Sequence, residues 1–329
     1  MTGRDRFLTT LRGGMTDRIP LWEIEFHLFD QYAEHPLILG RTFESLERDE
    51  KERALRQNAE TMVQVALRLE HDALSCPGGY WEVAPGVPAY YWLPEDYPWR
   101  QLVELRREAG DKLALVMFTS GMIMPPAGKG YEEFCYRLFD SPGDVDRLAA
   151  AELASGIRGV TRAGELGADA VCCGCDIADN HGVFFSPPQL DRFWLPYLHR
   201  WTAVVRETGL CSILHSDGNL TAILDHLASG GLDALQAIDP VAGMNMETVK
   251  HAVGNRLTLC GNLDCGLLQF GPIEKIAEQT RRIMEAGKPG GRFVFGSTNA
   301  VFKEIPLCHY EAALAAWRRC RLLEFVSES

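Results

Sequence analysis

Eight short apolar runs alternate with longer amphipathic stretches along the chain, and this alternation limits the possible folds more than any other feature. The runs are rich in Val, Leu, Ile and Cys, which is typical of parallel strands whose two faces are both buried. Parallel strands need a long return connection, usually a helix, so the order of elements predicts an α/β fold. The runs span residues 19–24, 72–76, 113–118, 170–174, 211–215, 234–238, 257–261 and 292–295.

The stretches between these runs have helical periodicity, and some of them begin with Asp, Asn or Pro. We predict helices over residues 44–69, 142–166, 188–208, 219–229, 273–286 and 311–325. Eight strands with interleaved helices favour a closed (β/α)8 TIM barrel, although a doubly wound open sheet can be built from the same alternation. Because no Pro/Ser-rich tract or block of like charge interrupts the pattern, residues 1–329 are predicted to form a single domain of this type.

Charge and composition exclude two classes of partner. The formal net charge of −12 leaves no broad basic surface for nucleic acid. No apolar run approaches the roughly 20 residues that cross a bilayer, and no apolar signal segment follows Met1 to Arg6. We therefore expect a cytoplasmic protein that acts on a small molecule, with its ten cysteines reduced and mostly buried. Cys172 and Cys175 have the spacing of half a zinc site, but no second pair completes it, so we interpret them as core residues.

The fifth run carries the sharpest chemical signal. In a closed barrel the active site lies at the C-terminal ends of the strands, and this run ends in His215-Ser216-Asp217. The two-residue step places His215 and Asp217 on one face. Imidazole and carboxylate are both zinc ligands, and the same pair can act as a base with its orienting acid. Alternatively, His215 only shapes the pocket and Asp217 caps the next helix.

Three further carboxylates end the first and fourth runs. Asp176 follows the fourth run, where a side chain opens into the site, and we predict a catalytic role for it. Glu23 and Glu25 share one face of the first run, and we predict that both contact substrate. The alternative for these two glutamates is an ion pair with a neighbouring arginine such as Arg18.

Amides and aromatic residues complete the candidate site. Asn262 and Asn299 follow the seventh and eighth runs and are predicted to orient a polar substrate group, unless both only close backbone turns. Aromatic residues and prolines crowd the segment 80–99 after the second run. There we expect Trp81 and Tyr91 to form a wall for a flat apolar ligand, with packing or a subunit interface as the alternatives.

Several segments, taken in order and spacing, resemble the uroporphyrinogen decarboxylase superfamily. The resemblance covers nearly the whole chain and implies a (β/α)8 barrel. It rests on Arg18-Ile19-Pro20-Leu21-Trp22, Ser186-Pro187 with Phe193 and Pro196-Tyr197, His215-Ser216-Asp217-Gly218-Asn219, Gly261-Asn262-Leu263-Asp264, and Ile305-Pro306 before Glu311.

The chain departs from the true decarboxylases of that superfamily at two places. Those enzymes carry an arginine-rich stretch after the first strand that binds substrate carboxylates, and a catalytic aspartate after the second. Here Glu23 and Glu25 occupy the first region, and Gly79 stands where the aspartate is expected. Because glutamates repel a polycarboxylated porphyrin, uroporphyrinogen is an improbable substrate.

The other large branch of the superfamily transfers methyl groups to or from corrinoid proteins. Several members resemble this chain at the fifth strand but use His-x-Cys and a later Cys as zinc ligands. Here Asp217 stands at the first cysteine position and Asn299 near the second. We expect an oxygen-rich zinc site of His215, Asp217 and Glu25. The resemblance implies a methyltransferase, an O-demethylase, that moves a methyl group from a methoxylated substrate to the cobalamin of a corrinoid partner; methoxylated aromatic compounds are among the candidate substrates. A decarboxylase for another carboxylated substrate and a non-catalytic barrel are the alternatives, and a homodimer is compatible with the sequence.

Overall fold

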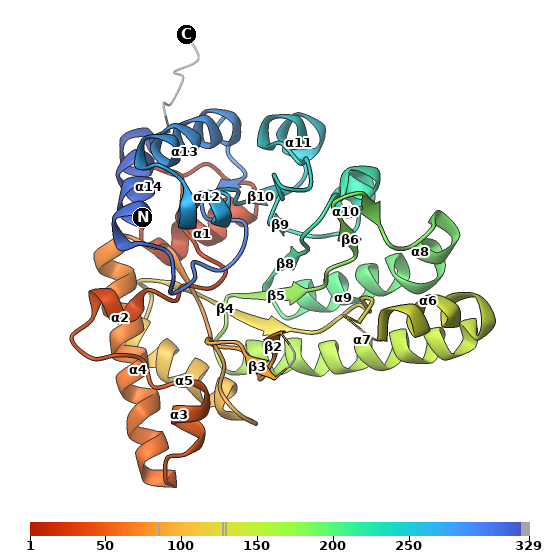
Figure 1. The fold of residues 1–329 in the computed structure, drawn as a ribbon, viewed down its shortest axis with the longest axis horizontal. Coiled ribbons are helices and arrows are strands. Elements are labelled where there is room, and N and C mark those ends of the chain that lie inside the picture. The colour runs from red at the N-terminus through yellow and green to blue at the C-terminus, as the bar shows by residue number, and fades with distance from the viewer. Residues whose placement is uncertain (85, 127, 129, 324–329) are drawn as a thin grey trace.

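A curled sheet of seven parallel strands forms the centre of the computed structural model, which describes residues 1–84, 86–126, 128 and 130–323 (Figure 1). The strands lie side by side in chain order, and every connection between neighbours passes through at least one helix. The predicted α/β fold with a parallel sheet is confirmed. The strands are β1 (Ala73–Ser75), β4 (Ala114–Thr119), β5 (Ala170–Gly174), β8 (Cys211–His215), β9 (Ala234–Gln236), β10 (Thr258–Cys260) and β11 (Phe293–Val294).

The prediction of a regular strand over residues 19–24 is wrong. Leu21 makes one isolated parallel bridge, to Phe295 beside β11. The N–H of Trp22 donates to the carbonyl of Phe295 at 3.0 Å, and the N–H of Asp72 donates to the carbonyl of Leu21 at 2.8 Å. Pro20 has no N–H to extend the ladder. The segment therefore contacts both edges of the sheet without forming a strand of its own.

The long predicted helices are present with shifted ends. The one expected over 188–208 is divided at Trp194 into α8 (Pro187–Phe193) and α9 (Leu195–Glu207). Within the described residues, none of the helices combines the length and the apolar character needed to cross a membrane. The other helices are α1 (Gly3–Leu11), α2 (Phe29–Tyr32), α3 (Gly40–Glu44), α4 (Arg48–Leu69), α5 (Tyr97–Ala109), α6 (Gly130–Asp140), α7 (Pro142–Glu165), α10 (Leu224–Ser229), α11 (Met246–Val253), α12 (Cys265–Phe270), α13 (Ile273–Gly287) and α14 (Leu307–Cys320).

The loops that follow three of the strands contain short elements of secondary structure. The hairpin β2 (Glu82–Ala84) and β3 (Val87–Pro88) follows β1, and the hairpin β6 (Ala178–Asp179) and β7 (Gly182–Val183) follows β5. A 3₁₀ turn, η1 (Thr221–Ile223), precedes α10. These loops lie at the C-terminal ends of the strands, where binding residues are concentrated in α/β folds.

The concave side of the sheet encloses a small apolar cluster of its own. It joins residues from all seven strands to Trp22 and Ile24, and Phe7 and Leu11 of α1 pack against it. Thr258, which begins β10, donates to the carbonyl of Thr10 in α1 at 3.0 Å. Helix α1 therefore covers the N-terminal ends of the strands, and their C-terminal ends stay free for a site.

Candidate functional site

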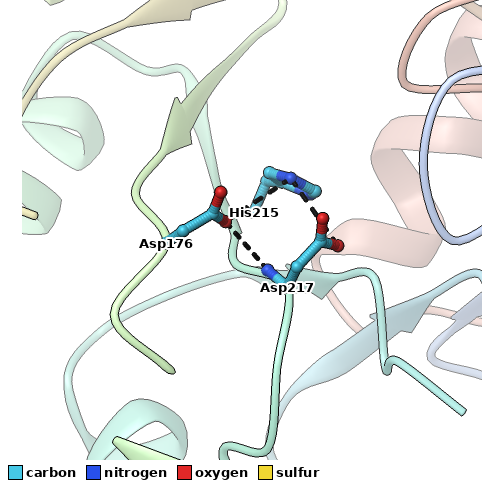
Figure 2. Close-up of side chains that lie close together, drawn as sticks. All are labelled: Asp176, His215 and Asp217. Atoms are coloured by element: carbon cyan, nitrogen blue, oxygen red, sulfur yellow. Dashed lines mark hydrogen bonds and ion pairs between the residues drawn. The ribbon is translucent and has the colours of Figure 1, made fainter. Parts of the chain in front are cut away.

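Three polar side chains converge where β5 and β8 end. The strands pair with Gly174 opposite His215, and Asp176 and Asp217 each follow two residues beyond. The Nε2 atom of His215 lies 3.8 Å from Oδ1 of Asp176 and 3.9 Å from Oδ1 of Asp217. The backbone N–H of Asp217 donates to Asp176 at 2.9 Å and ties the two loops together (Figure 2). We call these three residues the His–Asp cluster.

The cluster is open to solvent on its acidic side. The side chains of Asp176 and Asp217 are 51% and 38% exposed, whereas that of His215 is 13% exposed. Their ligand atoms all lie within 4.8 Å of one another, so one cation could be shared among them. The distances from His215 to the carboxylates are too long for direct hydrogen bonds, which leaves room between them for a ligand.

His215 is oriented by a residue that the sequence analysis did not identify. Its Nδ1 atom is paired with Oε1 of Gln236, which is buried at the end of β9 in register with His215. In the sequence, Gln236 is the single polar residue of the apolar run 234–238. A buried amide needs partners, so such a residue at a strand end is a candidate positioning group.

Asp217 is held by the predicted amide Asn299. The Nδ2 atom of Asn299 donates to Oδ2 of Asp217 at 2.7 Å, which places Asn299 beside the cluster. Burial raises the pKa of Asp217, and the nearby carboxylates of Asp176 and Asp239 act in the same direction, against His215 and Asn299. Asp239, a second residue that the sequence analysis missed, accepts the N–H of Gly218 at 3.2 Å.

Open space adjoins the histidine. Gly174 is exposed, although it ends a strand whose other residues are buried. A Cβ atom added at Gly174 would meet no atom within 4 Å. The missing side chain therefore leaves a gap at the level of His215.

The two glutamates of the first segment do not join the cluster. Among the described residues, the set of three ligand groups contains Asp176 in the place expected for Glu25. Oε2 of Glu25 accepts instead from Nε2 of His27 at 2.9 Å, and the Glu25 side chain is 13% exposed. Glu23 is buried, with 5% of its surface exposed, and accepts the N–H of Ser297. Neither glutamate pairs with Arg18, whose guanidinium bonds Asp72.

The remaining candidates differ in exposure. Trp81 is 43% exposed. Tyr91, by contrast, is 1% exposed and donates to the carbonyl of Ser75 at 2.9 Å, so it does not form the predicted wall. Asn262 is buried and donates to the carbonyl of Ile238 at 2.7 Å. The two cysteines expected in the core are both buried, Cys172 on the concave side of the sheet and Cys175 in the outer core.

About two thirds of the chain is similar in sequence to uroporphyrinogen decarboxylases. Residues 104–320 match the model of the family described as uroporphyrinogen decarboxylase (URO-D). A uroporphyrinogen decarboxylase of Syntrophotalea carbinolica is 25% identical over 61% of this chain and 58% of its own length. The chloroplastic uroporphyrinogen decarboxylase 2 of Arabidopsis thaliana is 28% identical over 61% of this chain and 51% of its own. The matched region thus spans little more than half of these curated relatives.

Solved structures support the fold. A methyltransferase from Methanosarcina mazei superposes with a TM-score of 0.72 at 16% identity, covering 97% of this chain and 99% of that one. A B12-independent methionine synthase from Shewanella sp. W3-18-1 has a TM-score of 0.52 at 11% identity, covering 92% and 96%. At these identities the similarity concerns the fold and leaves the chemistry to be argued from the site.

Proposed function

We propose that this chain, which belongs to the uroporphyrinogen decarboxylase family, is a methyltransferase component. It would take a methyl group from a methoxylated substrate and deliver it to the cobalt of a separate corrinoid protein. The observation that carries the proposal is the His–Asp cluster, where three ligand atoms converge beside open space. An ether releases its methyl group poorly because alkoxide is a poor leaving group, so the oxygen must be protonated or bound by a cation.

We also propose that the sheet closes into a (β/α)8 barrel. The supporting contacts are those of Leu21, which bridges to Phe295 on one side and accepts from Asp72 on the other. Closure would bring the C-terminal ends of all strands around one mouth. The His–Asp cluster and Gly174 would then lie at that mouth, where the corrinoid of the partner protein would also approach.

The cluster fits a bound cation such as zinc. His215 keeps one ring nitrogen toward Asp176 and Asp217, and its other nitrogen is held by Gln236, the arrangement in which metal-binding histidines are usually oriented. One nitrogen and two carboxylate donors suit zinc. A zinc ion held there would act as a Lewis acid on the substrate oxygen.

The chain's own residues would hold and orient the substrate. Asp176 and Asp217 keep negative charge at the site, and Asn299 fixes the direction of the Asp217 carboxylate. The gap over Gly174 offers room for the group that bears the methoxy oxygen, and exposed Trp81 offers a face for an aromatic ring. The corrinoid would supply the nucleophile from the partner.

A second candidate is a decarboxylase for a smaller carboxylated substrate, because the curated relatives are decarboxylases by name. Uroporphyrinogen itself fits poorly. The exposed carboxylates of Asp176 and Asp217 would repel its carboxylates, since like charges at short range are unfavourable.

The test uses chemically reduced cobalamin as methyl acceptor and a panel of methoxylated aromatic compounds. We expect the wild-type protein to form methylated cobalt, followed by absorbance, and we expect the His215→Ala variant not to. Carbon dioxide release from uroporphyrinogen is measured in parallel. Decarboxylation at an ordinary enzymatic rate, with no methyl transfer from any member of the panel, would contradict the proposal.

A further inference from the structure

His215 is connected to the core by a series of hydrogen bonds that determines which ring nitrogen carries a proton. The first bond joins Nδ1 of His215 to Oε1 of Gln236. Gln236 is 2% exposed, so its amide cannot exchange this partner for water. The direction of the amide therefore decides whether Nδ1 donates or accepts.

The surroundings of Gln236 fix that direction. Its Nε2 atom lies 3.1 Å from the carbonyl oxygen of Ser297 and 3.0 Å from that of Thr298. Carbonyl oxygens only accept hydrogen bonds, so the NH₂ end of the amide must face them. The oxygen end then faces His215, and because an amide oxygen only accepts, Nδ1 must carry the hydrogen.

The backbone that holds Gln236 is held in turn by Glu23. Oε2 of Glu23 accepts from the backbone N–H of Ser297 at 2.8 Å and from the hydroxyl of Ser297 at 2.5 Å. Its other oxygen accepts from the hydroxyl of Tyr310 at 3.2 Å. Glu23 thereby fixes the turn whose carbonyl groups orient the Gln236 amide.

We propose that Gln236 is a positioning residue that fixes His215 as the tautomer with hydrogen on Nδ1, and that Glu23 supports it through Ser297. The lone pair of Nε2 then faces the oxygens of Asp176 and Asp217. The use of that lone pair, for a cation or a substrate proton, rests on the proposed function; the tautomer does not. A histidine that exchanged between tautomers would offer the lone pair only part of the time.

The proposal is tested on the protein alone by long-range ¹H–¹⁵N correlation spectra with ¹⁵N-labelled histidine, recorded in alkaline buffer where imidazoles are neutral. His215→Gln identifies the signal of His215 by its loss. We expect the wild-type His215 to show a protonated Nδ1 and an unprotonated Nε2. A wild-type His215 protonated on Nε2 would overturn the proposal, whatever the outcome of the methyl-transfer assay.

Substitutions test the roles of Gln236 and Glu23 one at a time. Gln236→Leu, which removes the acceptor that faces Nδ1, should populate both tautomers. Gln101→Leu is the matched control, because Gln101 is also fully buried and bonds a backbone carbonyl, that of Leu55, on the outer side of the sheet. An unchanged single tautomer in Gln236→Leu would overturn the role of Gln236.

Glu23 is examined in the same way. Glu23→Gln keeps an acceptor for Ser297 and should leave the tautomer of His215 unchanged, whereas Glu23→Leu should populate both forms. A single wild-type tautomer in Glu23→Leu would remove Glu23 from the account and leave Gln236 in it.

Discussion

Glu23 and the acids of the His–Asp cluster both lie beside strand ends, yet their surroundings are opposite. Glu23 is buried, and its two oxygens accept from Ser297 and Tyr310. Asp176 and Asp217 are partly exposed, and Nε2 of His215 lies just beyond hydrogen-bond distance of both carboxylates. A buried carboxylate whose oxygens already accept hydrogen bonds positions its neighbours, whereas a partly exposed carboxylate remains available to bind a ligand.

The largest effect is expected at the open group. His215→Ala should lower the rate of methyl transfer by about 10³-fold, the order of magnitude for losing an acid–base group or ligand. The melting temperature should fall by only a few degrees, since His215 lies at the edge of the core and water can enter the space left by its ring to bond Gln236. His199→Ala, at an exposed position on α9, is the control. Methyl transfer by His215→Ala within tenfold of wild type would assign His215 a structural role.

At the buried group the expected effect is on stability. Burial raises the pKa of Glu23 from 4.5 to about 7, so the folded state favours the protonated acid. The resulting stabilisation is present below pH 4.5 and is lost as the pH rises through about 7. Over that window it amounts to about 3 kcal/mol. Glu23→Gln, which cannot ionise, should not show this loss.

The measurement is the free energy of unfolding in urea at several pH values, taken as the difference between wild type and Glu23→Gln. The difference matters because His71 contributes with the opposite sign: burial lowers its pKa from 6.5 to about 3, so stability is lost as the pH falls. A pH-independent difference between the two proteins would show that Glu23 is not the buried acid described here.

A smaller effect is expected where the site is open. Gly174→Ala should fill part of the gap beside His215 and lower kcat/KM for aromatic donors by about tenfold, the scale of one added methyl group in a binding pocket. Gly164→Ala is the matched control, because a Cβ there meets only ordinary contacts at 3.8 Å, near the end of α7. Unchanged kcat/KM across small and large donors would place the substrate elsewhere.

The smallest effect is expected at the aromatic segment. Trp81→Ala should raise KM for methoxylated aromatic donors by a few fold with little change in kcat, in line with about 1 kcal/mol for one aromatic contact. Tyr91→Phe should leave KM unchanged, because Tyr91 is buried and its hydroxyl bonds the Ser75 carbonyl. An equal rise in KM for both variants would contradict this distinction.

Local patterns in the sequence predicted most of the sheet and the cluster. The runs 170–174 and 211–215 coincide with β5 and β8, because each is a short, mainly apolar run followed within two residues by an aspartate. Asp176 and Asp217 each follow a strand end by two residues. The prediction that they lie near His215 at the C-terminal ends of the strands is confirmed. These features depend only on neighbours along the chain.

The predictions that were wrong or incomplete concern residues whose partners lie far along the sequence or whose backbone is irregular. Glu23 and Glu25 were expected on one face, but the chain bends at Ile24 and Glu25 and loses the two-residue period of a strand. The partners of Glu23 lie far along the sequence, at Ser297 and Tyr310. Gln236 is a single polar residue in an apolar run. Its role could not be predicted because it depends on the register of β9 with β8, which places it opposite His215.

The central claim, that the open carboxylates and His215 form one ligand-binding group, is tested most directly by titrating Zn²⁺ calorimetrically into metal-free protein. We expect one site in the wild type, and a loss of affinity of at least about 100-fold in Asp176→Asn and His215→Gln, beyond the range for residues that only orient a ligand. Glu25→Gln should bind like wild type, because Glu25 is paired with His27. Absence of zinc binding, or equal losses in Asp176→Asn and Glu25→Gln, would contradict the account.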